Sequence, residues 1–118
     1  MKHIKISDLE DMSKIYRLNL INSVTGYKSA HLIGSQTLKG NANLAIFSSV
    51  VHLGSNPALI GFIIRPTTVP RHTYSNIKAT GTFTLNAISK KQIADAHHTS
   101  AKYPENISEF DKTNLEIE

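Results

Sequence analysis

Apolar residues along this chain come in short blocks separated by turn residues. The first block, 7–25, offers Ser7 or Asp8 as an N-cap and carries acidic residues in its first turn. It continues with a short amphipathic pattern that Gly26 ends, so we expect a helix over this range. The segment 29–37 that follows predicts a strand, and turn residues separate it from the next apolar block.

Two apolar blocks lie on either side of the sequence GSNP. Residues 44–53 are rich in Val, Ile and Phe, and residues 58–66 form the clearest strand pattern, which Pro66 closes. The GSNP segment breaks the chain between them with strong turn formers. Because so short a connection cannot hold a crossover, we expect these two strands to be antiparallel neighbours.

The second half of the chain alternates between helix and strand patterns. Residues 70–79 predict a helix, with Thr68 as its candidate cap and Pro70 in the first turn. Residues 81–89 alternate in polarity, which is typical of a half-buried strand. One face of this strand would carry Phe83, Leu85 and Ala87, and the other Thr82, Thr84 and Asn86.

The C-terminal part predicts one more helix and a capped turn. Residues 90–103 favour a helix that stops before Pro104, and Ser108 with Asp111 three residues later has capping-box spacing. Taken together, the elements predict a mainly β fold with peripheral helices, in which the strands form a small barrel or a strongly curved sheet. No G-x-G-x-x-G or P-loop pattern occurs, so the common nucleotide-binding folds lack their usual support.

The composition is that of an ordinary globular protein, with 40% of the 118 residues hydrophobic and 19% charged. This length predicts one domain, residues 1–118, with a single core. No apolar stretch approaches the roughly 20 residues that span a bilayer, and the polar start is not a secretory signal. The absence of cysteine excludes disulfides, thiolate catalysis and Cys-based metal sites. We expect a cytoplasmic protein with no membrane partner.

The net charge of +4 permits an anionic partner. The lysines are scattered, however, and no Lys/Arg run, RNA-binding strand motif or Cys/His finger occurs, so nucleic acid is not expected. Histidines are numerous, but none has i, i+4 spacing, and adjacent His97 and His98 would point to different sides of a helix. A native metal site is therefore not expected either.

The sequence RPTTVPRHT, residues 65–73, combines cations and hydroxyls between a predicted strand and a predicted helix. Free N–H groups and the helix dipole favour an anion at a helix N-terminus. Guanidinium groups match phosphate oxygens, and the hydroxyls and a histidine add donors. The candidate phosphate ligands are Arg65, Thr67, Thr68, Arg71, His72 and Thr73. The alternative is that Arg71 and His72 are solvated residues at a helix start and Thr68 is only a cap.

Ser48 and Ser49 lie side by side in an otherwise apolar strand pattern. Consecutive strand residues point to opposite faces, so one of the two hydroxyls must face the interior or a cavity. A buried hydroxyl needs a partner, and the polar edge of a flat heteroaromatic ring supplies several. The alternative is a hydroxyl bonded to a neighbouring backbone carbonyl.

Four segments together resemble the flavin reductase-like family, the FMN-binding split barrels: LNLINSVTGYKSAHLIGS, NLAIFSSVVHLGSNPALIGFIIRPT, VPRHTYSNIKATGTFTLN and AHHTSAKYP. The resemblance runs from about Leu18 to Phe110 and keeps the order and spacing of the blocks. It implies a Greek-key-like split β-barrel, a homodimer with FMN near the subunit interface, and hydride transfer from NADH or NADPH to flavin. Family members are usually longer, so the resemblance also implies that this chain lacks the family's C-terminal part.

The resemblance assigns cofactor contacts to three segments. The strand NLAIFSS resembles the family segment along the flavin ring, RPTTVPRHT the phosphate-binding turn, and AHHTSAKYP the part that approaches the exposed face of the flavin. The cofactor-binding residues implied are Asn43, Ala45, Phe47, Ser48, Ser49, Arg65, Thr68, Arg71, His72, Thr73, His97, Ser100 and Lys102, with Thr99 as a further possible contact.

The flavin would supply the redox chemistry, and the protein would place it, exclude water and tune it. No catalytic protein residue is required, and no G-x-S-x-G or paired-carboxylate pattern occurs. Three functions remain open from the sequence. The first is an FMN-dependent oxidoreductase that passes electrons from NAD(P)H to a small-molecule acceptor. The second is a non-catalytic FMN-binding or electron-carrier module. The third is a basic interaction domain that has lost the cofactor.

Overall fold

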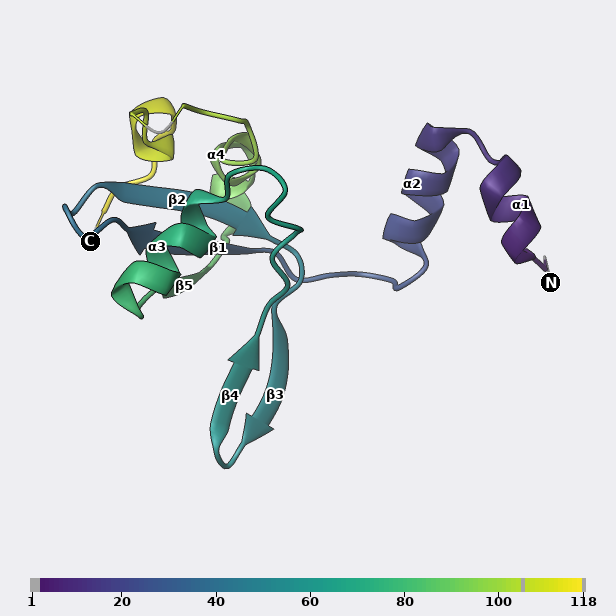
Figure 1. Ribbon diagram of the computed structural model, residues 1–118, viewed down its shortest axis with the longest axis horizontal. Helices are drawn as coiled ribbons and strands as arrows, with labels where there is room; N and C mark the ends of the chain where they lie inside the picture. The colour runs from purple at the N-terminus through teal and green to yellow at the C-terminus, as the bar shows by residue number, and fades with distance from the viewer. Residues whose placement is uncertain (1–2, 105, 118) are drawn as a thin grey trace.

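The computed structural model describes residues 3–104 and 106–117 and shows a sheet body from which two segments project (Figure 1). One is an N-terminal arm with two helices, and the other is a two-stranded hairpin. The radius of gyration is 16.8 Å. A compact domain of this length would have a radius of about 13–14 Å, so the projecting segments expand the molecule considerably.

The N-terminal arm contains α1 (Ile6–Asp11) and α2 (Lys14–Ser23), where the sequence predicted one helix. The single-helix prediction is wrong because Met12 is extended, with φ −67° and ψ 142°, which ends α1. The hydroxyl of Ser13 then accepts a hydrogen bond from the Tyr16 N–H and starts a new helix. The Arg17 guanidinium donates to the Leu9 carbonyl at 3.1 Å and holds the two helices together.

The body of the molecule is a three-stranded antiparallel sheet in the order β2-β1-β5. Its strands are β1 (His31–Gln36), β2 (Ala42–Phe47) and β5 (Thr84–Ala87). Gly40, with φ +85°, makes the left-handed turn that joins β1 to β2. The predicted strand at 81–89 is confirmed as β5, although it is shorter.

A separate hairpin consists of β3 (Val51–Ser55) and β4 (Ala58–Gly61), paired antiparallel across the GSNP turn as predicted. The single strand predicted at 44–53 is therefore wrong, because the chain leaves the body sheet after Phe47 and enters the hairpin at Val51. The strand predicted at 58–66 ends early, at Gly61.

Three later elements surround the sheet. Helix α3 (His72–Thr80) has Arg71 at its N-cap position, so the predicted cap at Thr68 and the first-turn role of Pro70 are wrong. The helix predicted at 90–103 is a 3₁₀ turn, η1 (Lys90–Gln92), followed by α4 (Ile93–His98). The capping box of Ser108 and Asp111 is confirmed at the start of a second 3₁₀ turn, η2 (Glu109–Lys112).

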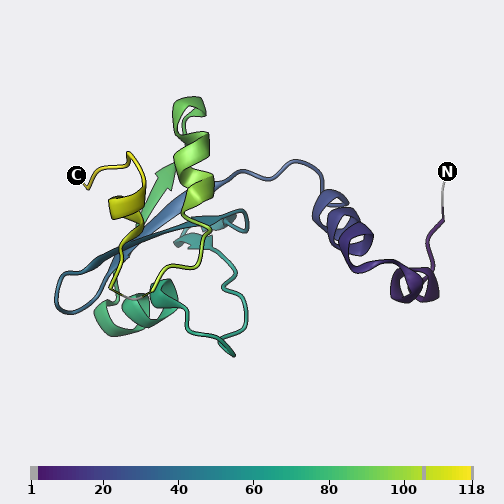
Figure 2. The same cartoon turned by 90° about the horizontal axis from the view of Figure 1, so that it is seen from above.

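The two faces of the body sheet carry different chemistry. Side chains alternate along β1, so Leu32 and Ser35 lie on opposite faces. The first face holds the apolar cluster of Leu32, Leu44 and Ala96, against which Ile46, Ile88, Phe110 and Leu115 pack. The second face holds the fully buried Ile33 together with a group of polar side chains, and it is covered by α3. Figure 2 shows α3 and α4 on opposite sides of the sheet.

The fold class needs one correction. The structure is a mixed α/β domain rather than a mainly β one, because its α-helices are as prominent as its short strands. The three-stranded sheet and the hairpin remain two separate sheets and do not close into a barrel. Strand β1 is central, and β2 and β5 form the two edges of the body sheet.

Gly34 in β1 permits a close approach of β5, and this generates a prediction. A Cβ built on Gly34 would lie 2.5 Å from Thr84 Oγ1. We expect Gly34→Ala to lower the free energy of unfolding by about 1–3 kcal/mol, because the Thr84 side chain must move or β5 must shift. Urea denaturation followed by circular dichroism measures the change.

The control for this prediction is the same substitution in a Thr84→Ala background. Removing Oγ1 takes away the atom that the new Cβ would meet, so the cost of Gly34→Ala should shrink there. An equal cost in both backgrounds would show that steric contact with Thr84 is not the reason for the glycine.

Candidate functional site

The predicted phosphate-binding segment forms the connection between β4 and α3. Arg65 and Thr68 are exposed in this connection, whereas Arg71 and His72 are half-buried at the start of α3. The Nε of Arg71 is a buried atom that has no hydrogen-bond partner among the described residues. No side chain caps α3, so its first backbone N–H groups keep their capacity to bind an anion.

A buried polar network joins the start of α3 to the body sheet. It consists of Ser35, Asn43, Thr73 and Asn76, each 9% exposed or less. The Asn43 amide donates to Thr73 Oγ1 at 3.1 Å and to Ser35 Oγ at 3.4 Å. The Asn76 amide donates to the same Ser35 hydroxyl at 3.2 Å. Two predicted site residues from distant segments, Asn43 and Thr73, are thus brought into direct contact.

Ser49 holds the predicted flavin strand beside the predicted phosphate segment. Its Oγ accepts a hydrogen bond from the Ile63 N–H and donates to the Ile63 carbonyl, both at 3.1 Å. This is the backbone-bonded alternative to a flavin contact that the sequence left open. The neighbouring Ser48 hydroxyl is exposed and remains available to a ligand.

Aromatic rings reinforce the same junction. Phe62 packs edge-to-face between Phe47 and Phe83, with a centroid distance of 5.3 Å to each ring. Phe47 and Ala45 follow Asn43 on the face of β2 that α3 covers, since alternate strand residues share a face. The side chains predicted to lie along a flavin ring therefore share one face with the start of α3.

The predicted contacts in the segment 97–102 lie elsewhere in the structure. His97 is exposed at the end of α4, and the exposed Ser100 donates its hydroxyl to the His97 carbonyl at 2.7 Å. Lys102 is also exposed, whereas Thr99 is buried and bonds to the Ala96 carbonyl. Because α4 covers the other face of the sheet, this segment does not join Asn43, Thr73 and Arg71 within the chain.

Sequence reasoning missed three polar residues that shape this region. Ser35 and Asn76 belong to the buried network, and Glu109, 7% exposed, accepts a hydrogen bond from the Leu44 N–H at 2.9 Å. A signal for Asn76 was present, because it lies three residues after Thr73 and thus on the same side of the helix. Nothing local in the sequence indicated that Glu109 would reach an edge strand 65 residues earlier.

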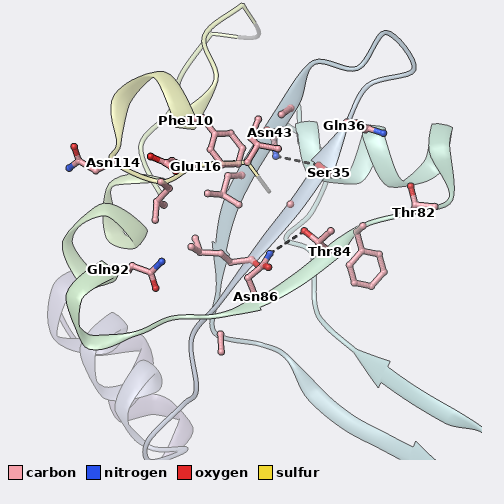
Figure 3. A pocket seen from close by; sticks show the side chains of 18 residues that line it. Ser35, Gln36, Asn43, Thr82, Thr84, Asn86, Gln92, Phe110, Asn114 and Glu116 are labelled. Carbon is pink, nitrogen blue, oxygen red and sulfur yellow. Dashed lines mark hydrogen bonds between the residues drawn. The ribbon is translucent and has the colours of Figure 1, made fainter.

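A cavity of about 690 Å³ opens on the α4 face of the sheet (Figure 3). Polar side chains from β5, η1 and the C-terminal segment line it, among them Thr84, Asn86, Gln92 and Asn114. Of the predicted cofactor contacts, Asn43 alone is among its lining residues. Its lining includes Ser35 and Asn43 of the buried network but no residue of α3.

Two further searches concern the described residues only. Among residues 3–104 and 106–117, no group of three or more His, Cys, Asp or Glu side chains is arranged to hold a metal ion. Within the same ranges, no helix has the length and hydropathy needed to cross a membrane.

The Ser49 contact generates a prediction about local stability. We expect Ser49→Ala to speed hydrogen exchange of the Ile63 amide by about tenfold, because that amide loses its acceptor and becomes exposed to water more often. Ser48→Ala is the matched control, since the Ser48 hydroxyl is exposed. Exchange followed by NMR measures both, and an unchanged Ile63 rate in Ser49→Ala would contradict the role of this contact.

Comparison with known proteins places the fold. The structure superposes on a protein from Shewanella frigidimarina NCIMB 400 assigned as a flavin reductase with a split barrel domain, with a TM-score of 0.91 and 45% identity. The match covers 98% of this chain and 57% of that protein. Nitrilotriacetate monooxygenase component B from Bacillus cereus matches with a TM-score of 0.80 and 22% identity, over 98% of this chain and 56% of that one.

A third solved structure, 2-nitrobenzoate 2-nitroreductase from Pseudomonas fluorescens, matches with a TM-score of 0.76 and 21% identity, over 94% of this chain and 51% of that protein. The chain thus spans little more than half the length of these structures. A search of curated proteins gave no match. Residues 28–118 match the flavin reductase like domain family. This range contains every strand and helix of the body and the hairpin. The chain therefore belongs to the flavin reductase-like family.

Proposed function

We propose that this chain binds FMN and serves as the flavin-binding part of an oxidoreductase that passes electrons from NADH or NADPH to a small-molecule acceptor. The observation that carries the proposal is the start of α3, where an uncapped helix N-terminus lies beside an arginine whose buried Nε has no partner among the described residues. Family membership supports a flavin as the ligand.

The phosphate of FMN fits the start of α3 on electrostatic grounds. Backbone N–H groups of His72, Thr73 and Tyr74 form the first turn of a nine-residue helix, whose dipole favours negative charge there. Arg71 would add a charge-assisted hydrogen bond through the Nε that now lacks a partner. Arg65 and Thr68, exposed on the same connection, are close enough in sequence to join the site.

The flavin ring would lie beside Ala45 and Phe47 near the end of β2, where the exposed Ser48 follows the strand and can reach the polar edge of the ring. When bound, the flavin supplies hydride acceptance from a nicotinamide and electron release to an acceptor. The residues of this chain bind and orient the ring and keep water from one side of it. Ser49 contributes by holding the Ile63 segment beside the strand.

We further propose a cytoplasmic homodimer with the flavin near the interface. His97, Ser100 and Lys102 are exposed at the end of α4 or just after it, and α4 lies on the far side of the sheet from α3. In such a dimer they are available to the flavin of the other copy rather than to their own. The competing function is a non-catalytic FMN-binding or electron-carrier module, because the described residues form a candidate place for the phosphate without themselves identifying a site for a nicotinamide.

Arg71→Ala tests the phosphate site. We expect FMN affinity to fall about 10- to 100-fold, on the order of one charged hydrogen bond of about 1.5–3 kcal/mol. Riboflavin, which lacks the phosphate, should bind equally well to the variant and the wild type. Arg17→Ala is the control, because it removes the same charge from the N-terminal arm. Fluorescence titration measures both ligands, and an unchanged FMN affinity would remove Arg71 from the site.

Anaerobic addition of NADH or NADPH to the FMN-loaded protein separates the two functions. Bleaching of the flavin absorbance at a rate well above that of free FMN supports the oxidoreductase, because the protein must then orient the nicotinamide. Bound flavin that is reduced no faster than free FMN supports the electron-carrier module. Comparing the two nucleotides identifies the preferred donor.

A further inference from the structure

The contact between α3 and the body sheet has an unusual composition. A helix that covers a sheet normally buries an apolar stripe. Here the buried residues of α3 are Thr73 and Asn76, one helical turn apart, and both are polar. Each is held by a hydrogen bond from or to the sheet: Thr73 accepts from Asn43 at 3.1 Å, and Asn76 donates to Ser35 at 3.2 Å.

The sheet side of this contact is equally specific. Ser35 and Asn43 are directly opposite partners in the pairing of β1 with β2. They are linked to each other as well, because the Asn43 amide also donates to Ser35 Oγ at 3.4 Å. The Ser35 hydroxyl therefore accepts from both amides, one on the neighbouring strand and one on the helix.

Two attachment points one turn apart constrain a helix in a way that apolar packing does not. Apolar side chains tolerate small sliding and rotation, whereas a hydrogen bond weakens steeply with distance and angle. Attachments at Thr73 and Asn76 fix both the position of α3 along the sheet and its rotation about its own axis. Arg71 lies two residues before Thr73, and Thr73 is itself in the first turn, so the direction of Arg71 and of the first-turn N–H groups is fixed by the same two bonds.

We infer that Asn76 and Ser35 are positioning residues for phosphate recognition, although neither touches the ligand. The inference rests on the proposed function, in which the start of α3 binds the FMN phosphate. Asn76 and Ser35 act through the helix: they hold it in the rotation that directs Arg71 and the N-terminal N–H groups toward one point. Their loss should therefore cost selectivity for the phosphorylated flavin more than affinity for the flavin ring.

The test compares FMN with riboflavin in the full-length chain. In Asn76→Ala we expect the FMN affinity to fall about tenfold and the riboflavin affinity to fall less than about twofold, as for the loss of one aligned hydrogen bond. Ser75→Ala is the matched control, because Ser75 is exposed on the same helix. Fluorescence titration gives all the dissociation constants, and urea denaturation shows that each variant is folded.

Ser35→Ala and the double variant Ser35→Ala with Asn76→Ala complete a double-mutant cycle. Because both residues act through one shared hydroxyl, the double variant should lose no more FMN selectivity than Ser35→Ala alone. An additive loss, an equal loss for FMN and riboflavin, or an unchanged FMN affinity would each overturn the inference. If Asn76→Ala does not fold, Asn76→Leu keeps the branched shape of the side chain and removes its hydrogen bond.

A second probe separates this inference from the proposed function. Inorganic phosphate is titrated into labelled protein, and the amide NMR signals of His72, Thr73 and Tyr74 are followed. Amide signals that shift on adding phosphate to the wild type, and shift less in Asn76→Ala, support the positioning role. If in that case no flavin binds, the proposed function alone fails. If the wild type binds FMN and Asn76→Ala binds FMN and phosphate equally well, the positioning role alone is overturned. If the wild type binds neither flavin nor phosphate, both the positioning role and the proposed function are overturned.

Discussion

The hydroxyl of Ser35 is the contact on which the arrangement of the candidate site depends. It accepts hydrogen bonds from Asn43 on the next strand and from Asn76 on α3, and all three side chains are buried. Leaving either amide without an acceptor in such surroundings costs about 1–3 kcal/mol. The helix therefore has one favoured placement on the sheet, and the start of the helix has one direction.

This constraint explains why the two faces of the sheet differ. The face under α4 is held by nonspecific apolar packing of Leu32, Leu44 and Ala96, which supplies stability over a small area. The face under α3 combines the fully buried Ile33 with hydrogen bonds that define a geometry. A site for a charged, rigid ligand gains more from the second kind of contact, because a displacement of a few tenths of an ångström already weakens a charged hydrogen bond.

Local patterns in the sequence predicted those features whose causes are local. The GSNP turn, the capping box at Ser108 and the helix after Pro70 each depend on neighbouring residues, and all three are present. The strand predicted at 44–53 failed because its break at Ser48 is caused by a tertiary bond from Ser49 to Ile63, fourteen residues away. In the same way, the sequence indicated Asn43 and Thr73 as site residues in two different segments. Their direct contact joins residues thirty positions apart, and no local sequence pattern predicts such a contact.

The location of the candidate phosphate site follows from the order of the elements. The connection from β4 to α3 must cross from the hairpin back to the body. Its first end is held by Ser49 and by the rings packed on Phe62, and the bond from Asn43 to Thr73 holds the helix at its other end. A connection held at both ends places Arg71 at the start of α3 without strain, since its N-cap backbone is extended. The groups proposed to hold the phosphate and those proposed to face the ring thus come from residues 43–76, a segment shorter than half the chain. The proposed flavin binding draws mainly on this segment, whereas the proposed turnover would also need surfaces that admit a nicotinamide and an acceptor.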